Sequence, residues 1–466
     1  MLGFIADSGT SVGLGHVMRC MTLAAAFAER GFKLFFAIAA DTTGTAQLIR
    51  QRGFACYEYT DADAIVNAIA LGDITADAWV LDSYRATAEQ EKILALHGYL
   101  FLISDFALGK HPAHIVLDQT LGRRSAEYVG HVPDECCVLT GSEYQLIRPE
   151  YFQQQRVRDY ARGVQHILVS MGGIDHNNHT RQVLIALREQ QQPLQISVLL
   201  TSQCPWLTQL QSEFTSGVDF FIDHPAPWQV VASADLAIGA GGTSQWERIA
   251  AGLPTLLIQV ADNQRDVIHN TVQAGLALAA PVYAQLGHFI AGLLQTPAAL
   301  LAVSQQCALA LSGPGQQQVL RRLMQHAPSF LKLRVVNSAD CDVIFAWQQA
   351  PGIRQYCRDT RVPEYTGHCL WFNKVSTDPQ QHFYIIELFS QPLGYLRLEP
   401  AQGRLEVSVL IDQNMHGLGV CTQALKIVRK SHAGHLLAFI KDDNIASQRA
   451  FAAAGFVAKD NGHWWG

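Results

Sequence analysis

Short, almost uninterrupted apolar runs recur through the first third of the chain and alternate with segments that have the apolar spacing of a helix. Such runs are typical of parallel strands that helices bury on both faces. We expect strands at Leu2–Ala6, Phe32–Ala40, Ala78–Ser83, Tyr99–Phe106 and His114–Thr120. Strands that alternate with helices in this way predict a Rossmann-like half over residues 1–150.

The same rhythm begins again after residue 150 and predicts a second Rossmann-like half over residues 151–325. Its apolar runs are Gln165–Gly173, Gln195–Ser202, Val218–Asp223, Ala234–Gly242 and Pro254–Val260. In open α/β sheets, ligands bind in the crevice outside the carboxyl ends of the strands. We therefore expect a ligand crevice lined by the loops that follow these strands.

The pattern changes near Gln325–Val336, where Pro328 and Ser329 indicate a linker. Residues 333–466 are enough for one small domain. Strand-like runs come first here, followed by a helix and a last strand; the runs are His382–Phe389, Pro392–Glu399, Leu405–Ile411 and Leu436–Lys441. This order predicts a mostly antiparallel α+β fold.

Composition narrows the class of protein. The chain has 466 residues, 49% hydrophobic and 16% charged, which is typical of a globular protein with more than one domain. Its net charge of -6 and the lack of any block of lysine or arginine argue against nucleic acid as a partner.

We expect a cytoplasmic protein without a membrane partner. The apolar runs are far shorter than the roughly 20 residues of a membrane helix, and Asp7 interrupts the first run at once, unlike a signal peptide. The ten cysteines form no CxxC pair, so we expect reduced thiols and no zinc site.

The first candidate for chemistry is Gly13-Leu14-Gly15-His16, where a strand is expected to turn into a helix. Glycines let the backbone approach a ligand closely, and a helix start attracts anions. A neutral imidazole on the first turn can take a proton from water. A helix-capping histidine in a glycine turn explains the same pattern. Arg19, one turn further, either pairs with Asp7 or simply packs.

Two later glycine loops follow predicted strands in the same manner. Gly172 and Gly173 lie in the segment SMGGIDHNN at residues 170–178. His176 and His179, with Asp175, have a spacing that fits solvated loop histidines better than a metal site, and we expect no metal. In the segment IGAGGTSQWERIAAGLP at residues 238–254, Thr243 or Ser244 is expected to cap a helix. Glu247 is then placed either to accept ribose hydroxyls or to complete a capping box with Ser244.

Together these segments resemble the UDP-sugar hydrolases of pseudaminic acid biosynthesis. The resemblance covers roughly residues 1–325 and rests on ADSGTSVGLGHVMRCMTLA (6–24), VLDSY (80–84), YQLIRPEYF (144–152), SMGGID (170–175) and GAGGTSQWERIAAGLPTLLIQVADNQ (239–264). It implies a GT-B-like fold similar to the lipid II N-acetylglucosaminyltransferase, with water in place of the sugar acceptor. The implied products are UDP and 2,4-diacetamido-2,4,6-trideoxy-L-altrose, formed with inversion.

The resemblance also implies roles for individual residues. His16 is the implied general base, and Tyr84 is expected close to the sugar. The implied contacts of the UDP-sugar are Asp7, Gly13, Gly15, Gly172, Gly173, Asp175, Gly242, Thr243, Ser244, Glu247 and Asn263. Ile5 and Gly9 depart from the arginine and serine usual in the family, which affects contacts of the first loop but not His16. A glycosyltransferase with an alcohol acceptor, or a non-enzymatic binder, is the alternative.

The tail carries a second resemblance, to the GNAT acetyltransferases. LEVSVLIDQNMHGLGVCTQALKIV (405–428) places glycines between a strand and a helix, and IKDDNIASQRAFAAAGF (440–456) follows a further strand. Amides at a helix start bind anions such as a pyrophosphate. The resemblance implies acetyl-CoA as co-substrate, held by a strand edge, a glycine loop and two further side chains: Val409, Leu410, Ile411, Gly417, Leu418, Gly419, Val420, Asn444 and Ser447.

Two departures affect the chemistry of the tail rather than its fold. Asn414 stands where glutamine or arginine is usual, and Phe451 stands where many members carry a tyrosine general acid. Glu406 is either a base acting through water or an exposed strand carboxylate. The implied substrate is a UDP-4-amino sugar whose acetylated product the first activity consumes. The alternative is a tail that serves only as a scaffold. Trp464 and Trp465 either pack on the tail or close a sugar site.

Overall fold

The computed structural model describes residues 1–9, 14–40, 44–190, 192–325, 330–432 and 434–466, and the side chain of Asn263 is not described. The chain forms two compact units. One contains Gly3–Ala25 and Leu34–Gln318, and the other contains Met1–Leu2, Ala26–Lys33 and Val319–Gly466. The predicted linker residues Pro328 and Ser329 lie outside the described residues.

The first sheet has seven strands in the order β3-β2-β1-β4-β5-β6-β7. Its strands are β1 (Leu2–Ala6), β2 (Leu34–Ala39), β3 (Ala55–Tyr59), β4 (Ala78–Asp82), β5 (Tyr99–Ile103), β6 (Ile115–Asp118) and β7 (Cys137–Thr140). The pairs β2–β3, β4–β5, β5–β6 and β6–β7 are parallel. Every residue of β1 and β4 is buried, which explains their continuous apolar runs.

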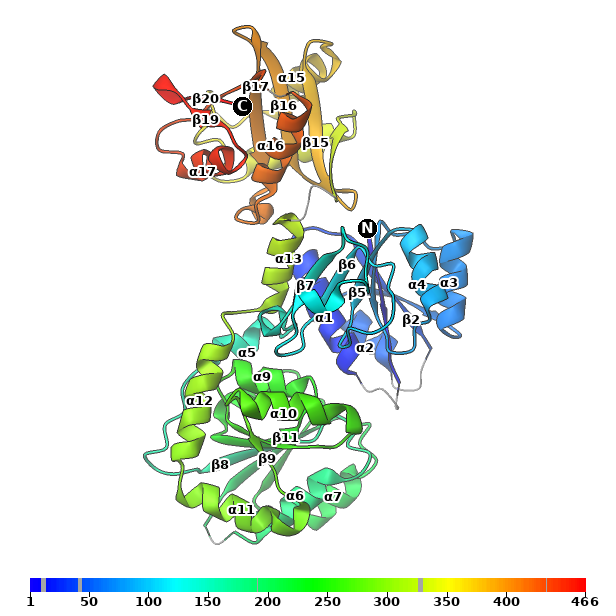
Figure 1. Cartoon of the computed structure of the whole chain (residues 1–466), viewed down its shortest axis with the longest axis vertical. Coiled ribbons are helices and arrows are strands. Elements are labelled where there is room, and N and C mark those ends of the chain that lie inside the picture. The colour runs from blue at the N-terminus through cyan, green and yellow to red at the C-terminus, as the bar shows by residue number, and fades with distance from the viewer. Residues whose placement is uncertain (10–13, 41–43, 191, 326–329, 433) are drawn as a thin grey trace. The chain divides into compact units, whose positions relative to one another are not determined.

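Helices connect these strands. They are α1 (Gly15–Ala28), α2 (Thr45–Gln51), α3 (Ala62–Leu71) and α4 (Ala88–Leu96). Figure 1 shows α3 and α4 side by side against the sheet, where Ile65, Ile69 and Leu94 join the apolar cluster around Trp79. The predicted Rossmann-type fold is confirmed for this part of the chain, although β3 and β7 were not predicted.

The second sheet has six strands in the order β10-β9-β8-β11-β12-β13, all of them parallel. The strands are β8 (His166–Ser170), β9 (Gln195–Leu200), β10 (Val218–Ile222), β11 (Leu236–Ala240), β12 (Thr255–Ile258) and β13 (Leu278–Ala279). The helices are α5 (Pro149–Gln153), α6 (His179–Arg188), α7 (Leu207–Glu213), α8 (Pro227–Ser233), α9 (Ser244–Ala250), α10 (Arg265–Gln273), α11 (Tyr283–Gln295), α12 (Ala298–Ala310) and α13 (Gly315–Gln325).

Alternate residues of β8 face opposite layers of this second Rossmann-type fold. Ile167 and Val169 pack in a cluster with α6, α7 and α11, whereas Leu168 packs in a second cluster with α8, α9 and α12. Figure 1 shows α6, α7 and α11 on one face of the sheet and α9 and α10 on the other. The prediction of a second Rossmann-type fold is therefore confirmed.

The tail is an α+β fold around a third sheet of seven strands, in the order β14-β15-β16-β17-β18-β20-β19. The strands are β14 (Leu331–Val335), β15 (His382–Leu388), β16 (Gln391–Ala401), β17 (Arg404–Ile411), β18 (Leu436–Phe439), β19 (Val457–Ala458) and β20 (His463–Trp465). The helices are α14 (Asp340–Gln349), α15 (Tyr365–Thr377), α16 (Val420–Ser431) and α17 (Ile445–Ala453). All neighbouring strands are antiparallel except β17 and β18, as the predicted mostly antiparallel sheet requires.

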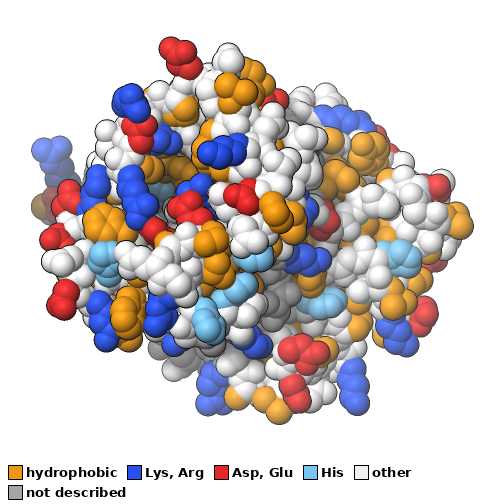
Figure 2. All heavy atoms as spheres, turned by 90° about the horizontal axis from the view of Figure 1, so that it is seen from above, with side chains coloured by type: hydrophobic (Ala, Val, Ile, Leu, Met, Phe, Trp, Pro, Cys, Tyr) orange, Lys and Arg blue, Asp and Glu red, His pale blue; other side chains and the backbone are white. Residues whose placement is uncertain are grey.

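Charged side chains are spread over the face drawn in Figure 2, where basic and acidic groups are interspersed with apolar ones. Within the described ranges, no single helix has the length and apolar character needed to cross a membrane, and the bent pair Tyr283–Gln295 and Ala298–Gln325 meets the criterion by length and composition alone. The ten cysteines are free thiols.

Candidate active site

Aspartates gather at the carboxyl edge of the first sheet. The strands β1, β4, β5 and β6 are neighbours there. Asp7 follows β1, Asp82 ends β4, Asp105 lies just past β5, and Asp118 ends β6. Each carboxylate accepts hydrogen bonds from nearby donors. Because parallel strands expose their ligand-binding loops at this edge, it is the place to look for chemistry.

His16 lies on the first turn of α1, as predicted. Its Nδ1 is 2.5 Å from Oδ1 of Asp82, and the two side chains are 7% and 0% exposed. An ionised carboxylate only accepts hydrogen bonds, so the proton is assigned to Nδ1 and Nε2 keeps its lone pair. Nε2 makes no hydrogen bond to the residues that the structure describes. The interpretation of His16 as a helix cap is wrong, because its ring bonds to a carboxylate of β4.

Arg19 holds the same aspartate from its other side. Its Nε and Nη2 donate to Asp82 at 2.6 and 2.7 Å, and Nη1 donates to Asp105 at 2.9 Å. The predicted pairing of Arg19 with Asp7 is therefore wrong. Burial raises the pKa of Asp82, but Arg19 and His16 outweigh it and hold that pKa well below its usual value. Asp82 is thus a buried anion that keeps its charge at neutral pH.

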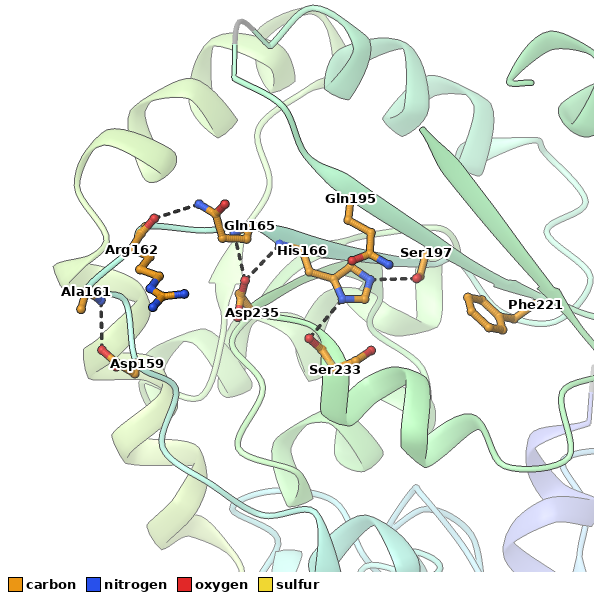
Figure 3. A pocket seen from close by; sticks show the side chains of 11 residues that line it. Asp159, Ala161, Arg162, Gln165, His166, Gln195, Ser197, Phe221, Ser233 and Asp235 are labelled. Carbon is orange, nitrogen blue, oxygen red and sulfur yellow. Dashed lines mark hydrogen bonds between the residues drawn. The ribbon is translucent and has the colours of Figure 1, made fainter. Parts of the chain in front are cut away.

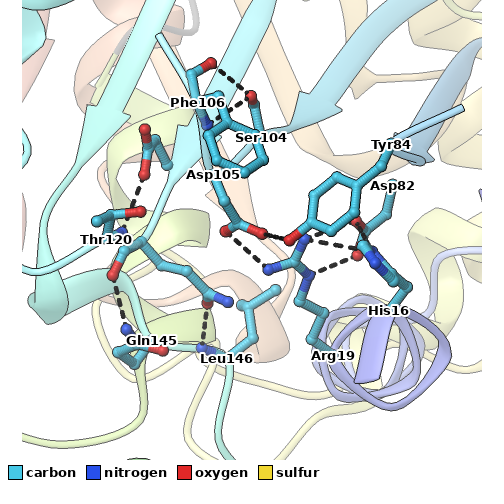
Figure 4. A network of polar contacts seen from close by, with 12 residues as sticks. His16, Arg19, Asp82, Tyr84, Ser104, Asp105, Phe106, Thr120, Gln145 and Leu146 are labelled. Carbon is cyan, nitrogen blue, oxygen red and sulfur yellow. Dashed lines mark hydrogen bonds and ion pairs between the residues drawn. The ribbon is translucent and has the colours of Figure 1, made fainter. Parts of the chain in front are cut away.

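Tyr84 completes this cluster, which Figure 4 shows. Its hydroxyl donates to Oδ2 of Asp105, and its ring stands edge-on to the His16 ring with 4.4 Å between centroids. Burial and the neighbouring Asp105 raise the pKa of Tyr84, so the phenol stays protonated. The sequence motifs predicted roles for His16 and Tyr84 but none for Asp82 or Asp105.

An exposed aromatic pair lies beside the cluster. Tyr84 and Phe106 are 48% and 46% exposed, with 5.5 Å between their ring centroids. Ser104 fixes the backbone of Phe106: its hydroxyl donates to the carbonyl of Phe106 and accepts from the amide of the same residue. The two rings therefore form an apolar surface next to His16.

Asp7 organises the turn after β4. It accepts from the Ser83 hydroxyl at 2.8 Å, from the Tyr84 amide at 3.0 Å and from Arg85 at 3.2 Å. These bonds fix the backbone that carries Tyr84. The predicted contact of Asp7 with the UDP-sugar stays a prediction, and Gly13 lies outside the described residues.

The second glycine loop joins β8 to α6. Gly172 has a φ of +93°, and a Cβ on Gly173 would lie 2.8 Å from Cγ2 of Thr201. The carboxylate of Asp175 accepts from the amides of His179 and Thr180 at 2.9 and 2.7 Å. The start of α6 is therefore already satisfied by a side-chain anion, and Asp175 acts as a helix cap.

The third glycine loop joins β11 to α9 and meets the first. A Cβ on Gly15 would lie 3.3 Å from Oγ1 of Thr243. The predicted helix cap is wrong: neither Thr243 nor Ser244 makes a side-chain cap bond, and Oγ of Ser244 accepts from Arg248 at 3.2 Å. The capping-box interpretation of Glu247 fails with it. Burial raises the pKa of the half-buried Glu247, opposed by Arg148 and Tyr151.

Arg148 lies in the motif YQLIRPEYF, where no role was predicted for it. Its guanidinium lies 4.8 Å from the ring centroid of Trp228 and 5.4 Å from that of Tyr151. Its Nε and Nη1 are buried without a hydrogen-bond partner among the described residues. This cation therefore has unused donors near Glu247. The side chain of Asn263, the remaining predicted contact, lies outside the described residues.

In the tail, β17 has an open edge where the predicted cofactor strand lies. It pairs with β16 from Arg404 to Ile411, but its parallel register with β18 ends at Glu406 opposite Leu437. Beyond that point, Val409 has no β18 partner among the described strand residues, whereas the backbone groups of Leu410 face Tyr395 of β16. The carbonyl of Ile411 is already contacted by Nε2 of His416 at 3.1 Å.

The glycine loop that follows has the predicted geometry. Gly417 and Gly419 have φ values of +78° and +87°, and α16 begins directly afterwards at Val420. A Cβ on either glycine would meet nothing within 4 Å, so these positions need glycine for backbone conformation rather than for packing. The open edge of β17, the glycine loop and the start of α16 can together hold a pantetheine chain that ends in a diphosphate.

Several tail side chains that the sequence singled out have partners within the fold, and the contact of Asn444 with the cofactor stays a prediction. Oδ1 of Asn444 caps α17 by accepting from the amide of Ser447 at 3.1 Å. Glu406 is not an exposed carboxylate, since it is 9% exposed and accepts from Arg358 at 2.6 Å. Phe451 is buried against Phe456 and brings no hydroxyl. Trp464 and Trp465 lie in β20, so they belong to the sheet.

A surface pocket lies at the opposite end of the second sheet from the glycine loops (Figure 3). His166 and Gln195 begin β8 and β9, and Asp235 precedes β11. Both ring nitrogens of His166 are engaged, by Ser197 and by the carbonyl of Ser233. Because α/β sheets bind ligands at the carboxyl ends of strands, we place no chemistry in this pocket. Within the described residues, no group of three or more histidine, cysteine, aspartate or glutamate side chains is arranged to hold a metal ion.

Residues 331–457 match the family described as Acetyltransferase (GNAT) domain. The UDP-2,4-diacetamido-2,4,6-trideoxy-beta-L-altropyranose hydrolase of Campylobacter jejuni is 26% identical over 227 residues, which are 47% of this chain and 77% of that protein. An uncharacterised protein of Methanocaldococcus jannaschii is 20% identical over 57% of each chain.

Two solved structures are similar to different parts of the chain. MurG of Acinetobacter baumannii covers 68% of this chain and 97% of its own, with 13% identity and a TM-score of 0.47. Spermidine N-acetyltransferase of Vibrio cholerae covers 28% of this chain and 83% of its own, with 16% identity and a TM-score of 0.26. From the sequence matches, the chain joins a part similar to a UDP-sugar hydrolase to an acetyltransferase domain of the GNAT family.

Proposed function

We propose that the amino-terminal part hydrolyses UDP-2,4-diacetamido-2,4,6-trideoxy-β-L-altropyranose to UDP and the free diacetamido sugar. The similarity to the Campylobacter jejuni hydrolase supports this substrate. The observation that carries the proposal is the bond between Nδ1 of His16 and the buried carboxylate of Asp82, at 2.5 Å. It leaves Nε2 as a proton acceptor beside a ligand-binding sheet edge.

In the proposed reaction, the oxygen of a water molecule bonds to the anomeric carbon while Nε2 of His16 takes one of its protons. The bond between the anomeric carbon and the diphosphate oxygen breaks, and its electron pair leaves with UDP. Since UDP is a stable anion, its departure needs no strong general acid. The imidazolium that forms is stabilised by Asp82, and general-base help of this kind is worth roughly 100- to 10,000-fold.

The state of Tyr84 favours direct attack by water. A covalent route would need an ionised phenol as nucleophile. The raised pKa of Tyr84 and the bond from its hydroxyl to Asp105 keep the phenol neutral. A single displacement inverts the anomeric centre, so we propose that the first product has the opposite anomeric configuration to the substrate.

We propose that the diphosphate and uridine bind at the glycine loops of the second sheet. Gly172, Gly173 and Gly242 allow a close approach of the ligand to the backbone, and Glu247 accepts ribose hydroxyls. Arg148, with its unpaired donors, adds positive charge near Glu247. Asp175 contributes only indirectly, because its carboxylate already occupies the amides of α6 and would repel a phosphate.

Hydrolysis is tested in H₂¹⁸O with the purified chain and no alcohol acceptor. The proposal predicts UDP without label and a free sugar that carries ¹⁸O at the anomeric carbon, detected by mass spectrometry. Label in UDP would mean cleavage of the P–O bond and a different mechanism. Turnover that appears only when an alcohol is added would identify a glycosyltransferase instead.

For the tail, we propose acetyl transfer to the 4-amino group of the UDP-linked amino sugar that precedes the hydrolase substrate. The match to the GNAT family, the open edge of β17 and the loop around Gly417 and Gly419 support a site for acetyl-CoA. Acetyl-CoA, when bound, supplies the acetyl group. Val409, whose backbone groups face the open edge, would then pair with the pantetheine amides, and the loop amides before α16 would hold the diphosphate.

Acetyl transfer is tested by incubating the chain with acetyl-CoA and the UDP-linked 4-amino sugar, and following free coenzyme A and the mass of the nucleotide sugar. One free thiol released for each gain of an acetyl group supports the proposal. No thiol release above the rate without sugar would instead indicate a tail that serves as a scaffold, in line with the missing hydroxyl at Phe451.

A further inference from the structure

One carboxylate in the His16 cluster enters the reaction described so far only as the acceptor of the Tyr84 hydroxyl. Asp105 lies in the loop after β5, and its side chain is 20% exposed. Its Oδ1 accepts from Nη1 of Arg19 at 2.9 Å, and its Oδ2 accepts from the hydroxyl of Tyr84. Asp105 therefore holds two members of the cluster at once, and neither of them is His16 or Asp82.

These contacts close a ring of five side chains (Figure 4). From Asp105 the ring passes through Arg19, whose other nitrogens bind Asp82, and from Asp82 to His16. It returns through Tyr84, whose ring meets the His16 ring at an interplanar angle of 86°. The position of the imidazole is thus fixed from two directions, by the carboxylate of Asp82 and by the ring of a tyrosine.

We propose that Asp105 is a positioning residue for hydrolysis, a role that rests on the hydrolase function proposed above. Through its bond to Tyr84 it holds the phenol ring against His16. Through its bond to Arg19 it orients the guanidinium fork toward Asp82. Both effects keep Nε2 of His16 aimed in one direction, and general bases act efficiently only when they are held in place.

Charge gives Asp105 a second effect. With His16 neutral, the ring contains one cation, Arg19, and two carboxylates, Asp82 and Asp105, so it carries one net negative charge. When His16 takes a proton from water, the ring becomes neutral. Arg19 and Asp82 are 4% and 0% exposed, and charges interact strongly in such a poorly solvated place. Asp105 therefore stabilises the imidazolium that the reaction forms.

The test compares Asp105→Asn with a matched exchange at another arginine. The asparagine side chain keeps the size of the aspartate but removes its charge and one acceptor. Arg181 is bound through Nε and Nη2 by Glu213, both at 2.7 Å, so Glu213→Gln removes a similar carboxylate outside the ring. We expect Asp105→Asn to lower kcat roughly 10- to 100-fold with little change in KM, and Glu213→Gln to leave both unchanged.

A double-mutant cycle separates positioning from a merely structural role. If Asp105 acts through Tyr84, Asp105→Asn will cost much less in the Tyr84→Phe background than in the wild type, because the bond between the two is already lost. Equal losses in the two backgrounds would overturn the action through Tyr84. Circular dichroism and thermal midpoints of all variants identify any that fail to fold.

A readout without substrate makes the result independent of the proposed reaction. In protein labelled with ¹⁵N-histidine, the His16 ring signals are identified by their loss in His16→Gln. We expect them to move in Asp105→Asn and Tyr84→Phe but not in Glu213→Gln. Unchanged signals and unchanged kcat in Asp105→Asn would overturn the proposal. If the wild type hydrolyses no UDP-sugar, the proposed function fails, and the signals alone support or overturn the positioning role.

Discussion

Asp82 binds Nδ1 of His16 at 2.5 Å, across 66 positions of sequence, with a carboxylate that has no exposure to solvent. The bond joins the last residue of β4 to the first turn of α1. It assigns the proton to Nδ1 and leaves Nε2 to act as a base. Arg19 donates to both oxygens of Asp82, and Sγ of Cys20 donates to Oδ2 at 3.7 Å, so the carboxylate is held in one orientation and the imidazole follows it.

We predict that Asp82→Asn lowers kcat for hydrolysis by roughly 100-fold or more. An amide at this position offers His16 either a donor or an acceptor, so the imidazole is free to adopt the wrong tautomer, and the imidazolium loses its counter-charge. Steady-state kinetics on the UDP-diacetamido sugar provides the measurement. Asp134→Asn, at an exposed position, is the control for loss of a carboxylate. Wild-type kcat in Asp82→Asn would contradict the role assigned to this bond.

The same carboxylate predicts how stability depends on pH. Its pKa in the folded chain lies below that of an unfolded aspartate, about 3.9. Its contribution is therefore complete above about pH 5 and is lost as the pH falls below about 4. At pH 7 we expect Asp82→Asn to lower the free energy of unfolding by about 3 kcal/mol. Urea unfolding between pH 3 and pH 8 should show this difference constant above pH 5 and smaller in acid. A difference that grows toward low pH would show that the sign is wrong.

The aromatic pair beside His16 predicts sugar selectivity. A 6-deoxy sugar with two acetamido groups presents methyl groups that the exposed rings of Tyr84 and Phe106 can cover. We predict that Phe106→Ala raises KM by about 10-fold with little change in kcat. The preference over UDP-N-acetylglucosamine, which has a hydroxyl at C6, should shrink as well. Tyr57→Ala removes an exposed ring from β3, which is four strands away from β5 in the sheet, and should change neither value. An unchanged KM in Phe106→Ala would place the sugar elsewhere.

Backbone conformation predicts the effect of a change in the tail. Gly419 has a φ of +87°, a region that costs a residue with a Cβ roughly 1 kcal/mol or more. Gly419→Val should therefore distort the loop before α16 and raise KM for acetyl-CoA by about 10-fold or more. Gly403→Val introduces a similar strain, at φ +71°, in the turn between β16 and β17. This control should leave KM for acetyl-CoA unchanged, and neither variant should slow hydrolysis. Equal effects of the two substitutions would mean that the loop does not hold the cofactor.

Much of the fold could be predicted because the central strands of both parallel sheets are buried on both faces. Runs such as that of β4 admit no polar position before the final aspartate and stand out in the sequence. In contrast, β3 has mostly exposed or half-buried side chains, and half of the β7 side chains are only half-buried. Neither carries a pattern that distinguishes it from a loop. The tail strands β14, β19 and β20 were missed for the same reason of exposure.

The candidate site could be predicted only where local sequence carries it. His16 and the glycine loops lie at strand-to-helix turns, which a chain pattern reveals. Asp82 and Asp105 both bind Arg19, which lies 63 positions from the first and 86 from the second in the sequence. Only the order of the strands in the sheet brings these residues together. The sequence signal that could have identified them is an aspartate at or just past the end of a buried apolar run, in VLD (80–82) and ISD (103–105). Such a signal is ambiguous alone, since Asp7 and Asp118 end similar runs but bind other partners.

One NMR time course tests the central claim that both activities reside in this chain. The UDP-linked 4-amino sugar is given to the wild type with and without acetyl-CoA, and to His16→Gln with acetyl-CoA. Our prediction is free diacetamido sugar only from the wild type with acetyl-CoA, and accumulation of the UDP-diacetamido sugar with His16→Gln. A nucleotide sugar that stays intact in the wild type with acetyl-CoA, or equal release of free sugar by His16→Gln, would contradict it.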